Sequence, residues 1–286
     1  MKETTIVDGE YRTENAKVSI DDRGFTLGDG LFETIPVYGG KPFLLGRHLN
    51  RLEAGALATD IHLPFDSEDI TKGIARLCND NGIVRGVARL TVTRGAGPRG
   101  YGVEGCNMHT WTLTVRPYSH PSDEKRREGY KLAISAIRKN RLAPLNAIKS
   151  TSALDKVLTL NKARKSGADE SLALTMEGYI SSCVSANIFW VKDENLYTPS
   201  LDCGILPGVT RQAVVELAER NGITVLQGKF ETAEIRNADE MLITNSLLEI
   251  MPVSSVESVF EGKPPGSVTL ELSRFYNELI SGQNIS

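Results

Sequence analysis

Hydrophobic and polar residues alternate along the chain in runs that predict short strands interspersed with helices. Near the start, β-like runs span 4–7 and 17–20. Two further runs, 31–38 and 42–45, flank a pair of glycines, which predicts a β-hairpin. The chain therefore opens as a region rich in strands.

Two helices are expected next, over 47–58 and 67–81, followed by strands at 84–93 and 108–115. The apolar residues that recur at helical spacing in them are Leu49, Leu52, Leu57, Ile70, Ile74 and Leu77.

A polar stretch with the sequence PYSHPSDEKRRE, at 117–128, cannot bury much apolar surface. It predicts a linker over 118–128. The chain then divides into a small N-terminal domain, 1–117, and a larger C-terminal domain, 129–286.

In the second half, strands and helices again alternate. Strands are predicted at 131–137, 171–175, 186–191 and, as the last core strand, 241–244, and helices at 153–165, 210–220 and 267–279. The first of these helices has its apolar positions at Leu154, Val157, Leu158 and Ala163. The fold class predicted is a mixed α/β (α+β) architecture with two layers or more.

The composition and net charge of the chain argue against several classes of protein. The 286 residues are 40% hydrophobic and 24% charged, with a net charge of −3, which is typical of a soluble globular protein and argues against nucleic-acid or membrane partners. No run approaches the ~18 apolar residues of a spanning helix, and the N-terminus lacks a signal-peptide pattern. Four cysteines without CxxC or Cys/His spacing predict reduced thiols, no metal site and a cytoplasmic location.

Four stretches are rich in glycine, hydroxyl and charged residues: 22–33, 144–152, 204–211 and 244–246. In the second, Lys149 follows two apolar residues, and burying a lysine is costly unless its pKa falls. An exposed loop lysine, with Ser152 capping the next helix, is the alternative. The third opens a helix whose N–H groups suit a phosphate, although a routine capped helix has the same pattern.

Taken together, these stretches resemble the class IV aminotransferases. These are fold-type IV enzymes that use pyridoxal 5′-phosphate (PLP), among them branched-chain and D-amino acid aminotransferases and 4-amino-4-deoxychorismate lyases. The resemblance runs from about 6 to 256 and is carried by DRGFTLGDGLFET, RHLNRL, TRGAGPRGY, IKS, GYISSCVSANIFW, YTP, GILPGVTR and TNSLLEIMPV. It implies the family's two-domain fold.

The resemblance implies roles for residues that hold the cofactor. Lys149 is expected to form the Schiff base with PLP and to shuttle the substrate's α-proton. Arg51 is expected to contact the cofactor phosphate, together with the backbone N–H groups of Val209 and Thr210 and the hydroxyl of Ser246.

The loop TRGAGPRGY is expected to bind substrate. Arg99 matches the arginine that clamps a substrate carboxylate in the D-amino acid enzymes, and Arg94 is the alternative. In that subgroup the loop comes from the neighbouring subunit, so the resemblance implies a homodimer. Phe32 stands where those enzymes have a tyrosine and is the second substrate-binding residue expected.

Ser182 is a departure from the family, which usually has a glutamate here to keep the pyridine nitrogen protonated. Glu177 lies nearby in sequence, but it belongs to a turn and is expected to face solvent. A hydroxyl cannot hold a pyridinium charge as a carboxylate does, so the cofactor becomes a weaker electron sink. Elimination depends on that sink less than transamination does.

The expected function is therefore a PLP enzyme that abstracts the Cα proton of a small amino-carboxylate substrate. The first expectation is a 4-amino-4-deoxychorismate lyase-type elimination that releases pyruvate. Two alternatives remain open: an aminotransferase of the D-amino acid, branched-chain or (R)-amine type, and a PLP-binding protein without catalytic activity.

Overall fold

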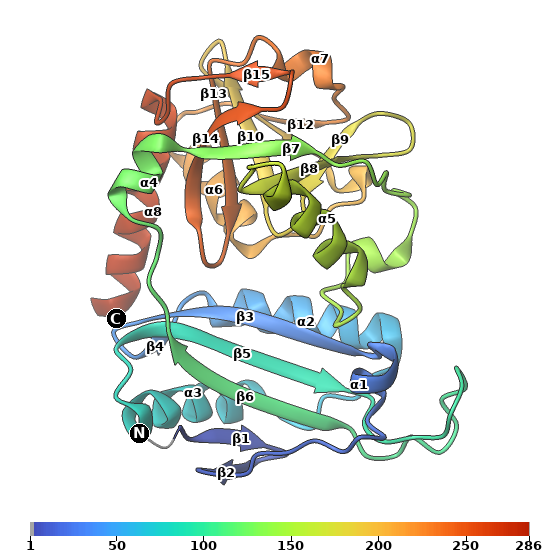
Figure 1. The fold of residues 1–286 in the computed structure, drawn as a ribbon. Helices are drawn as coiled ribbons and strands as arrows, with labels where there is room; N and C mark the ends of the chain where they lie inside the picture. The colour runs from blue at the N-terminus through green and yellow to red at the C-terminus, as the bar shows by residue number, and fades with distance from the viewer. Residues whose placement is uncertain (1–2, 286) are drawn as a thin grey trace. The chain divides into compact units, whose positions relative to one another are not determined.

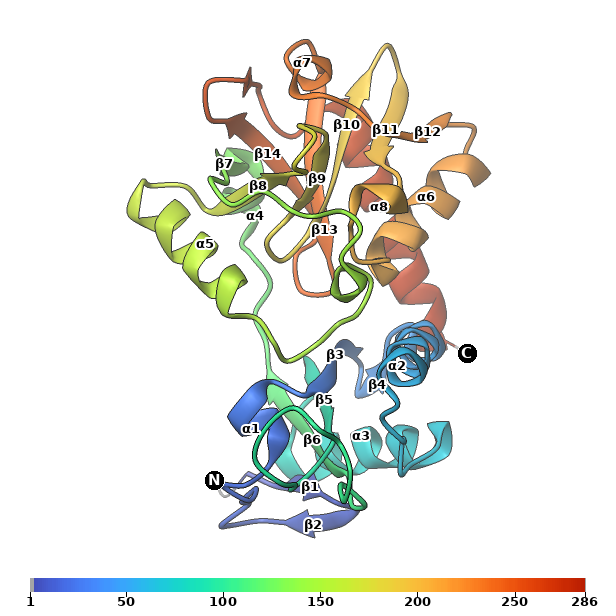
Figure 2. The same ribbon diagram turned by 90° about the vertical axis from the view of Figure 1, so that its right-hand side faces the viewer.

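The computed structural model describes residues 3–285, which fall into two compact units, each built on its own sheet (Figures 1 and 2). The first unit contains the chain up to Ser119, the segment Ile148–Ala153 and the chain end from Gln283; the second contains His120–Ala147 and Leu154–Gly282. The sequence placed Lys149 in the C-terminal domain, whereas its segment clusters with the first unit.

The first unit has a six-stranded antiparallel sheet in the order β2-β1-β6-β5-β3-β4. Its strands are β1 (Thr5–Val7), β2 (Glu10–Arg12), β3 (Gly30–Tyr38), β4 (Lys41–Pro42), β5 (Arg85–Thr93) and β6 (Thr110–Pro117). The expected hairpin is present as β3 and β4. The strand expected at 17–20 is absent, and these residues are exposed.

Three helices accompany this sheet: α1 (Arg23–Leu27), α2 (Leu45–Thr59) and α3 (Ser67–Asn81). The last two pack on the sheet, where their apolar residues share one core with Ile35 and Leu90 (Figure 2). α3 begins with a capping box between Asp66 and Asp69, which satisfies its first N–H groups.

Leu57 departs from the predicted apolar face of α2. Leu49 and Leu52 are buried, but Leu57 is 83% exposed. Five positions along a helix turn a side chain about 140° away from the starting direction, so Leu57 points away from Leu52. Ala56, four positions after Leu52, takes the buried place instead.

The second unit has a nine-stranded mixed sheet in the order β12-β11-β10-β13-β14-β7-β8-β9, with β15 paired to β14. Its strands are β7 (Tyr130–Ile134), β8 (Glu170–Leu174), β9 (Ile180–Cys183), β10 (Asn187–Lys192), β11 (Asn195–Pro199), β12 (Val225–Gly228), β13 (Glu240–Asn245), β14 (Glu249–Val256) and β15 (Phe260–Glu261). The pairs β11–β12, β14–β7 and β7–β8 are parallel.

The helices of the second unit are α4 (Asp123–Glu128), α5 (Leu154–Lys165), α6 (Val209–Arg220), α7 (Thr232–Ile235) and α8 (Ser267–Ile285), with short 3₁₀ turns at Pro144–Asn146 and Leu201–Cys203. Within residues 3–285, no helix is both long and apolar enough to cross a membrane.

The segment expected as a linker contains the short helix α4, in which the Ser122 hydroxyl accepts from Lys125 N and caps the first turn. Two predictions for this half are corrected. The strand at 241–244 is not the last of the core, since β14 follows after a tight turn. In α5, Leu154, Val157 and Leu158 are exposed and only Ala163 is buried. Leu154, Val157 and Leu158 share a face, whereas Ala163, nine positions after Leu154, lies on the opposite side of the helix.

We predict that Leu52→Ala lowers the free energy of unfolding by about 2–5 kcal/mol, because it leaves a cavity in a packed core. The matched change on the same helix, Leu57→Ala, should stay within about 0.5 kcal/mol of the native protein. Chemical denaturation measures both variants, and equal losses would contradict the assigned faces of α2.

Candidate functional site

The backbone of Lys149 is paired with the beginning of β3. Phe32 N donates to Lys149 O at 2.9 Å, and Thr151 N donates to Gly30 O at 2.8 Å. Between them, Ser150 forms an antiparallel bridge with Leu31. These contacts place the lysine beside β3, although its nearest elements in sequence belong to the second unit.

Phe32 lies beneath two cations. Lys149 Nζ is 4.5 Å from the centre of its ring, and Arg89 Cζ is 3.3 Å from it, both within the range of cation–π contacts. Thr34 pairs with Arg89 across β3 and β5, and the Arg89 guanidinium donates to the Thr34 hydroxyl at 3.3 Å. Sequence reasoning missed Arg89, although a charged residue alternating with the buried residues of β5 was a usable signal.

Glu33 points to the opposite face of β3, where it is fully buried and meets α2. The guanidinium of Arg51 donates to both carboxylate oxygens, at 2.8 and 2.7 Å. His48 Nδ1 lies 2.7 Å from Glu33 Oε2. His48 and Arg51 are three residues apart on α2, so one helical turn presents both to the same carboxylate.

Burial alone would raise the pKa of Glu33, but the hydrogen bonds from His48 and Arg51 outweigh it and lower this pKa to about 2. Burial also lowers the pKa of His48, against the opposing pull of Glu33. At neutral pH the carboxylate is therefore ionised and the imidazole is neutral, donating through Nδ1. Arg51 is held as a charged, oriented group.

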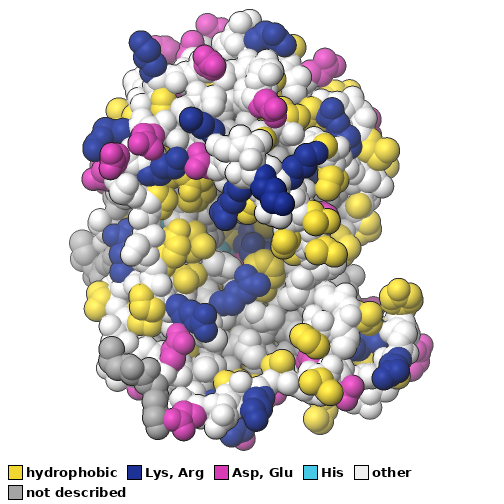
Figure 3. Space-filling view, viewed as in Figure 1, with side chains coloured by type: hydrophobic (Ala, Val, Ile, Leu, Met, Phe, Trp, Pro, Cys, Tyr) yellow, Lys and Arg dark blue, Asp and Glu magenta, His cyan; other side chains and the backbone are white. Residues whose placement is uncertain are grey.

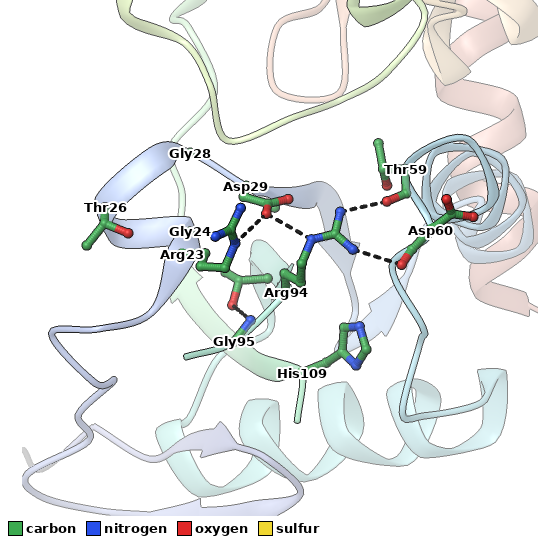
Figure 4. A network of polar contacts seen from close by, with 12 residues as sticks. Arg23, Gly24, Thr26, Gly28, Asp29, Thr59, Asp60, Arg94, Gly95 and His109 are labelled. Atoms are coloured by element: carbon green, nitrogen blue, oxygen red, sulfur yellow. Dashed lines mark hydrogen bonds and ion pairs between the residues drawn. The ribbon is translucent and has the colours of Figure 1, made fainter. Parts of the chain in front are cut away.

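Arg94 is committed to structural contacts (Figure 4). Its Nε donates to Asp29 at 2.8 Å, and its two terminal nitrogens donate to Asp60 O at 2.9 Å and Thr59 O at 2.7 Å. Burial raises the pKa of Asp29, but hydrogen bonds from Arg94 and Arg23 outweigh it and lower that pKa. Arg94 is thus a weak alternative to Arg99 as a substrate clamp.

Arg23 holds the loop that bears Arg99. This buried side chain donates to Pro98 O at 3.2 Å and Gly100 O at 3.0 Å, the carbonyls on either side of Arg99, while its Nε binds Asp29 at 2.9 Å. Arg99 itself is exposed. The DRGF and TRG motifs therefore form one polar network that fixes the base of the loop.

In the second unit, Ser182 lies on β9 and is 5% exposed. Lys139 Nζ donates to its hydroxyl oxygen at 2.9 Å. Burial, then the charge of Lys156, lowers the pKa of Lys139 to about 8. Glu177 is exposed and pairs with Arg141 at 3.1 Å, as expected of a solvent-facing turn residue. Sequence reasoning missed Lys139, which lies 43 positions from Ser182.

The start of α6 has no side-chain cap. Its N-cap is Gly208, and Val209 and Thr210 follow as buried residues. A Cβ at Gly208 would lie 2.0 Å from Asn187 Oδ1, so a side chain there would displace the Asn187 amide, which donates to Leu206 O at 3.1 Å. The backbone N–H groups of a helix start bind phosphate well.

Ser246 follows β13, on which α6 packs, and it is partly buried. Next to this turn, the hydroxyl of Thr244 is buried with no hydrogen-bond partner among the residues that the structure describes. The uncapped N–H groups at the start of α6 and the hydroxyls of Thr244 and Ser246 are hydrogen-bond donors of the kind that bind a phosphate group.

The expected site residues are divided between the two units. Lys149 and Phe32 are in contact in the first unit, where Arg51 lies on α2 and Arg99 on an exposed loop. The expected residues of the second unit are Ser182, Val209, Thr210 and Ser246.

Comparison with known proteins identifies relatives over nearly the whole chain. It is 32% identical over 272 residues to a D-alanine aminotransferase of Listeria monocytogenes, covering 94% of this chain and 92% of the relative. It is 33% identical over 277 residues to an aminodeoxychorismate lyase of Bacillus subtilis, covering 96% and 94%.

The fold has a close counterpart in the branched-chain amino acid aminotransferase of Escherichia coli. The TM-score is 0.90 at 26% identity, covering 96% of this chain and 93% of the other. Another branched-chain enzyme with the same fold was solved with pyridoxamine 5′-phosphate.

The sequence pattern of the family described as Amino-transferase class IV matches residues 30–256. The expected fold, the expected cofactor and an enzymatic role are confirmed. The chain belongs to the class IV aminotransferase family of PLP-dependent enzymes.

Proposed function

We propose that this enzyme catalyses an elimination of the 4-amino-4-deoxychorismate lyase type, releasing pyruvate. The single observation that supports this reaction is Ser182, a buried hydroxyl where the family usually has a carboxylate. No carboxylate of the described residues bonds to it, and Glu177 pairs with Arg141 instead. Without that carboxylate, PLP stabilises a carbanion less well, which disfavours transamination more than elimination.

In this reaction, the expected site residues would attach the cofactor, move the substrate proton and hold the cofactor phosphate. Lys149 would bind the cofactor covalently through Nζ and move the proton at the substrate Cα. Arg51, Val209, Thr210 and Ser246 would hold the phosphate through charge-assisted and backbone hydrogen bonds. Glu33 supports this role, because it fixes the Arg51 guanidinium by two hydrogen bonds.

Amino transfer is the second candidate, and the D-alanine aminotransferases among the relatives favour it. The two reactions differ in their need for an acceptor, since transamination requires a 2-oxo acid and elimination does not. We would supply aminodeoxychorismate alone and, separately, D- or L-amino acids or an (R)-amine with a 2-oxo acid. Pyruvate from aminodeoxychorismate alone supports elimination. Amino transfer without such pyruvate would overturn it.

We also propose a cytoplasmic homodimer in which the Arg99 loop serves the neighbouring subunit. All four cysteines are free thiols, which fits a reducing compartment. The lobe formed by α1 and the loop after β5, at the lower right in Figure 3, displays apolar side chains. Phe25 and Tyr101 are 73% and 90% exposed, and exposed apolar groups favour burial against a partner.

We predict that Lys149→Ala abolishes turnover and covalent attachment of PLP without unfolding the protein. An exposed lysine of α5 provides the control, so Lys165→Ala should retain both properties. Borohydride reduction followed by peptide mass analysis locates the labelled lysine. Labelling at another lysine in Lys149→Ala would refute the assignment.

We predict that Arg51→Ala weakens PLP binding by about 1.5–3 kcal/mol, the value of a hydrogen bond to a charged group. The variant also leaves Glu33 buried without its arginine, so its unfolding midpoint should fall. Titration of folded apoprotein with PLP measures the first effect, with the exposed change Arg116→Ala as control. Unchanged PLP affinity would restrict Arg51 to supporting Glu33.

We predict that Arg99→Ala depresses turnover of carboxylate substrates far more than PLP affinity. Arg94→Ala should instead lower stability, by about 1–3 kcal/mol for each buried group left unpaired. Mixing Arg99→Ala with Lys149→Ala protein tests the subunit exchange. Partial activity in the mixture is expected, because a mixed dimer forms one site with both native residues. No recovery in exchanged dimers would contradict a clamp from the neighbouring subunit.

A further inference from the structure

Lys139 and Ser182 form a fixed donor–acceptor pair. The backbone of Lys139 is tied to the end of β8, since Lys139 N donates to Leu174 O at 2.9 Å and Met176 N donates to Lys139 O at 3.0 Å. Its Nζ then donates to Ser182 Oγ at 2.9 Å. Ser182 is held by β9, so both ends of this contact are anchored by strands.

The direction of this hydrogen bond follows from the chemistry of the two groups. An ammonium group only donates, so the Ser182 oxygen accepts from Lys139. The hydroxyl hydrogen of Ser182 is then directed to a different acceptor. Among the residues described, no side-chain or backbone acceptor takes that hydrogen within hydrogen-bond distance.

Lys139 remains mainly cationic at neutral pH, although its surroundings lower its pKa. Burial lowers its pKa most, Lys156 lowers it further, and Cys183 and Asp155 act in the opposite direction, leaving a value of about 8. A cation at this position repels a second positive charge nearby.

Resting on the proposed function, we infer that Lys139 is a positioning residue that turns the Ser182 hydroxyl into a hydrogen-bond donor to an unprotonated pyridine nitrogen of the cofactor. A pyridine nitrogen with a free lone pair accepts the Ser182 hydrogen. A pyridinium N–H would instead need an acceptor, and the Ser182 oxygen already accepts from Lys139. The ammonium charge adds electrostatic opposition to protonation of the ring.

This pair reverses the polarity of the contact that a carboxylate would make. A carboxylate accepts a hydrogen bond and stabilises the positive ring, whereas the Lys139–Ser182 pair donates and destabilises it. The loss of the carboxylate at 182 and the presence of a lysine at 139 therefore act together. The ring is held as a weak electron sink by two residues, not by the absence of one.

The test uses the 286-residue chain loaded with ¹⁵N-labelled PLP, and its readout is the ¹⁵N resonance of the ring nitrogen. The native protein should give the resonance of an unprotonated pyridine. Lys139→Met should move it toward the protonated range, and Lys139→Arg, which restores a cationic donor, should move it back. Lys156→Met removes a neighbouring charge without touching Ser182 and should change it little.

A second series separates the two residues. Ser182→Glu should shift the nitrogen toward the protonated range, and adding Lys139→Met should complete that shift, because Lys139 otherwise competes for the new carboxylate. Thermal unfolding of each apoprotein shows whether a variant is folded, and none of these resonance shifts follows from stability alone.

Two results would overturn the inference: a protonated nitrogen in the native protein, or a Lys139→Met resonance identical to the native one. Failure of the proposed function is recognised separately, by peptide mass analysis after borohydride reduction. If Lys149 does not bind the cofactor, both proposals fall. If Lys149 is labelled and the native nitrogen is protonated, only the role of Lys139 and Ser182 is overturned.

Discussion

The pairing of residues 149–151 with β3 is the constraint on which the first unit's chemistry depends. A backbone hydrogen bond of 2.9 Å joins Phe32 N to Lys149 O, and the bridge between Leu31 and Ser150 fixes the register. Successive residues of a strand face opposite sides of the sheet. In this register, Phe32 therefore contacts Lys149 on one side, and Glu33 contacts α2 on the other. One short stretch of β3 thus contacts Lys149 on one side and supports Arg51 through Glu33 on the other.

The buried charged groups Glu33 and Lys139, one in each unit, have different kinds of hydrogen-bond partner. In the first, Glu33 is surrounded by His48 and Arg51, so that burial is compensated by hydrogen bonds and the pKa falls to about 2. In the second, the bonded partner of Lys139 within the described part of the chain is a hydroxyl and not a carboxylate, and burial lowers its pKa to about 8. The first arrangement fixes the Arg51 guanidinium, and the second places a cation beside Ser182, the position where the family usually has an anion.

Local patterns in the sequence predicted much of the fold, including the β3–β4 hairpin and α3, whose bounds match. They failed where the answer depended on distant residues. The exposed apolar residues of α5 have the same helical spacing as buried ones would have. The turn between β13 and β14 is only three residues long, and its composition did not mark where one strand ends and the next begins. For the site, motifs predicted Lys149 and Arg51, but Lys139 became visible only when the fold joined it to Ser182. Separation along the chain hid that pair.

In the proposed function, the contact between Lys139 and Ser182 directs the enzyme toward elimination. The most direct test of this claim is the partition ratio in one reaction mixture that contains both aminodeoxychorismate and a 2-oxo acid, counting pyruvate released against amino groups transferred. We predict that the native protein strongly favours pyruvate release and that Ser182→Glu combined with Lys139→Met shifts the ratio toward transfer. A native protein that mainly transfers amino groups, with a ratio unchanged in the double variant, would contradict the account.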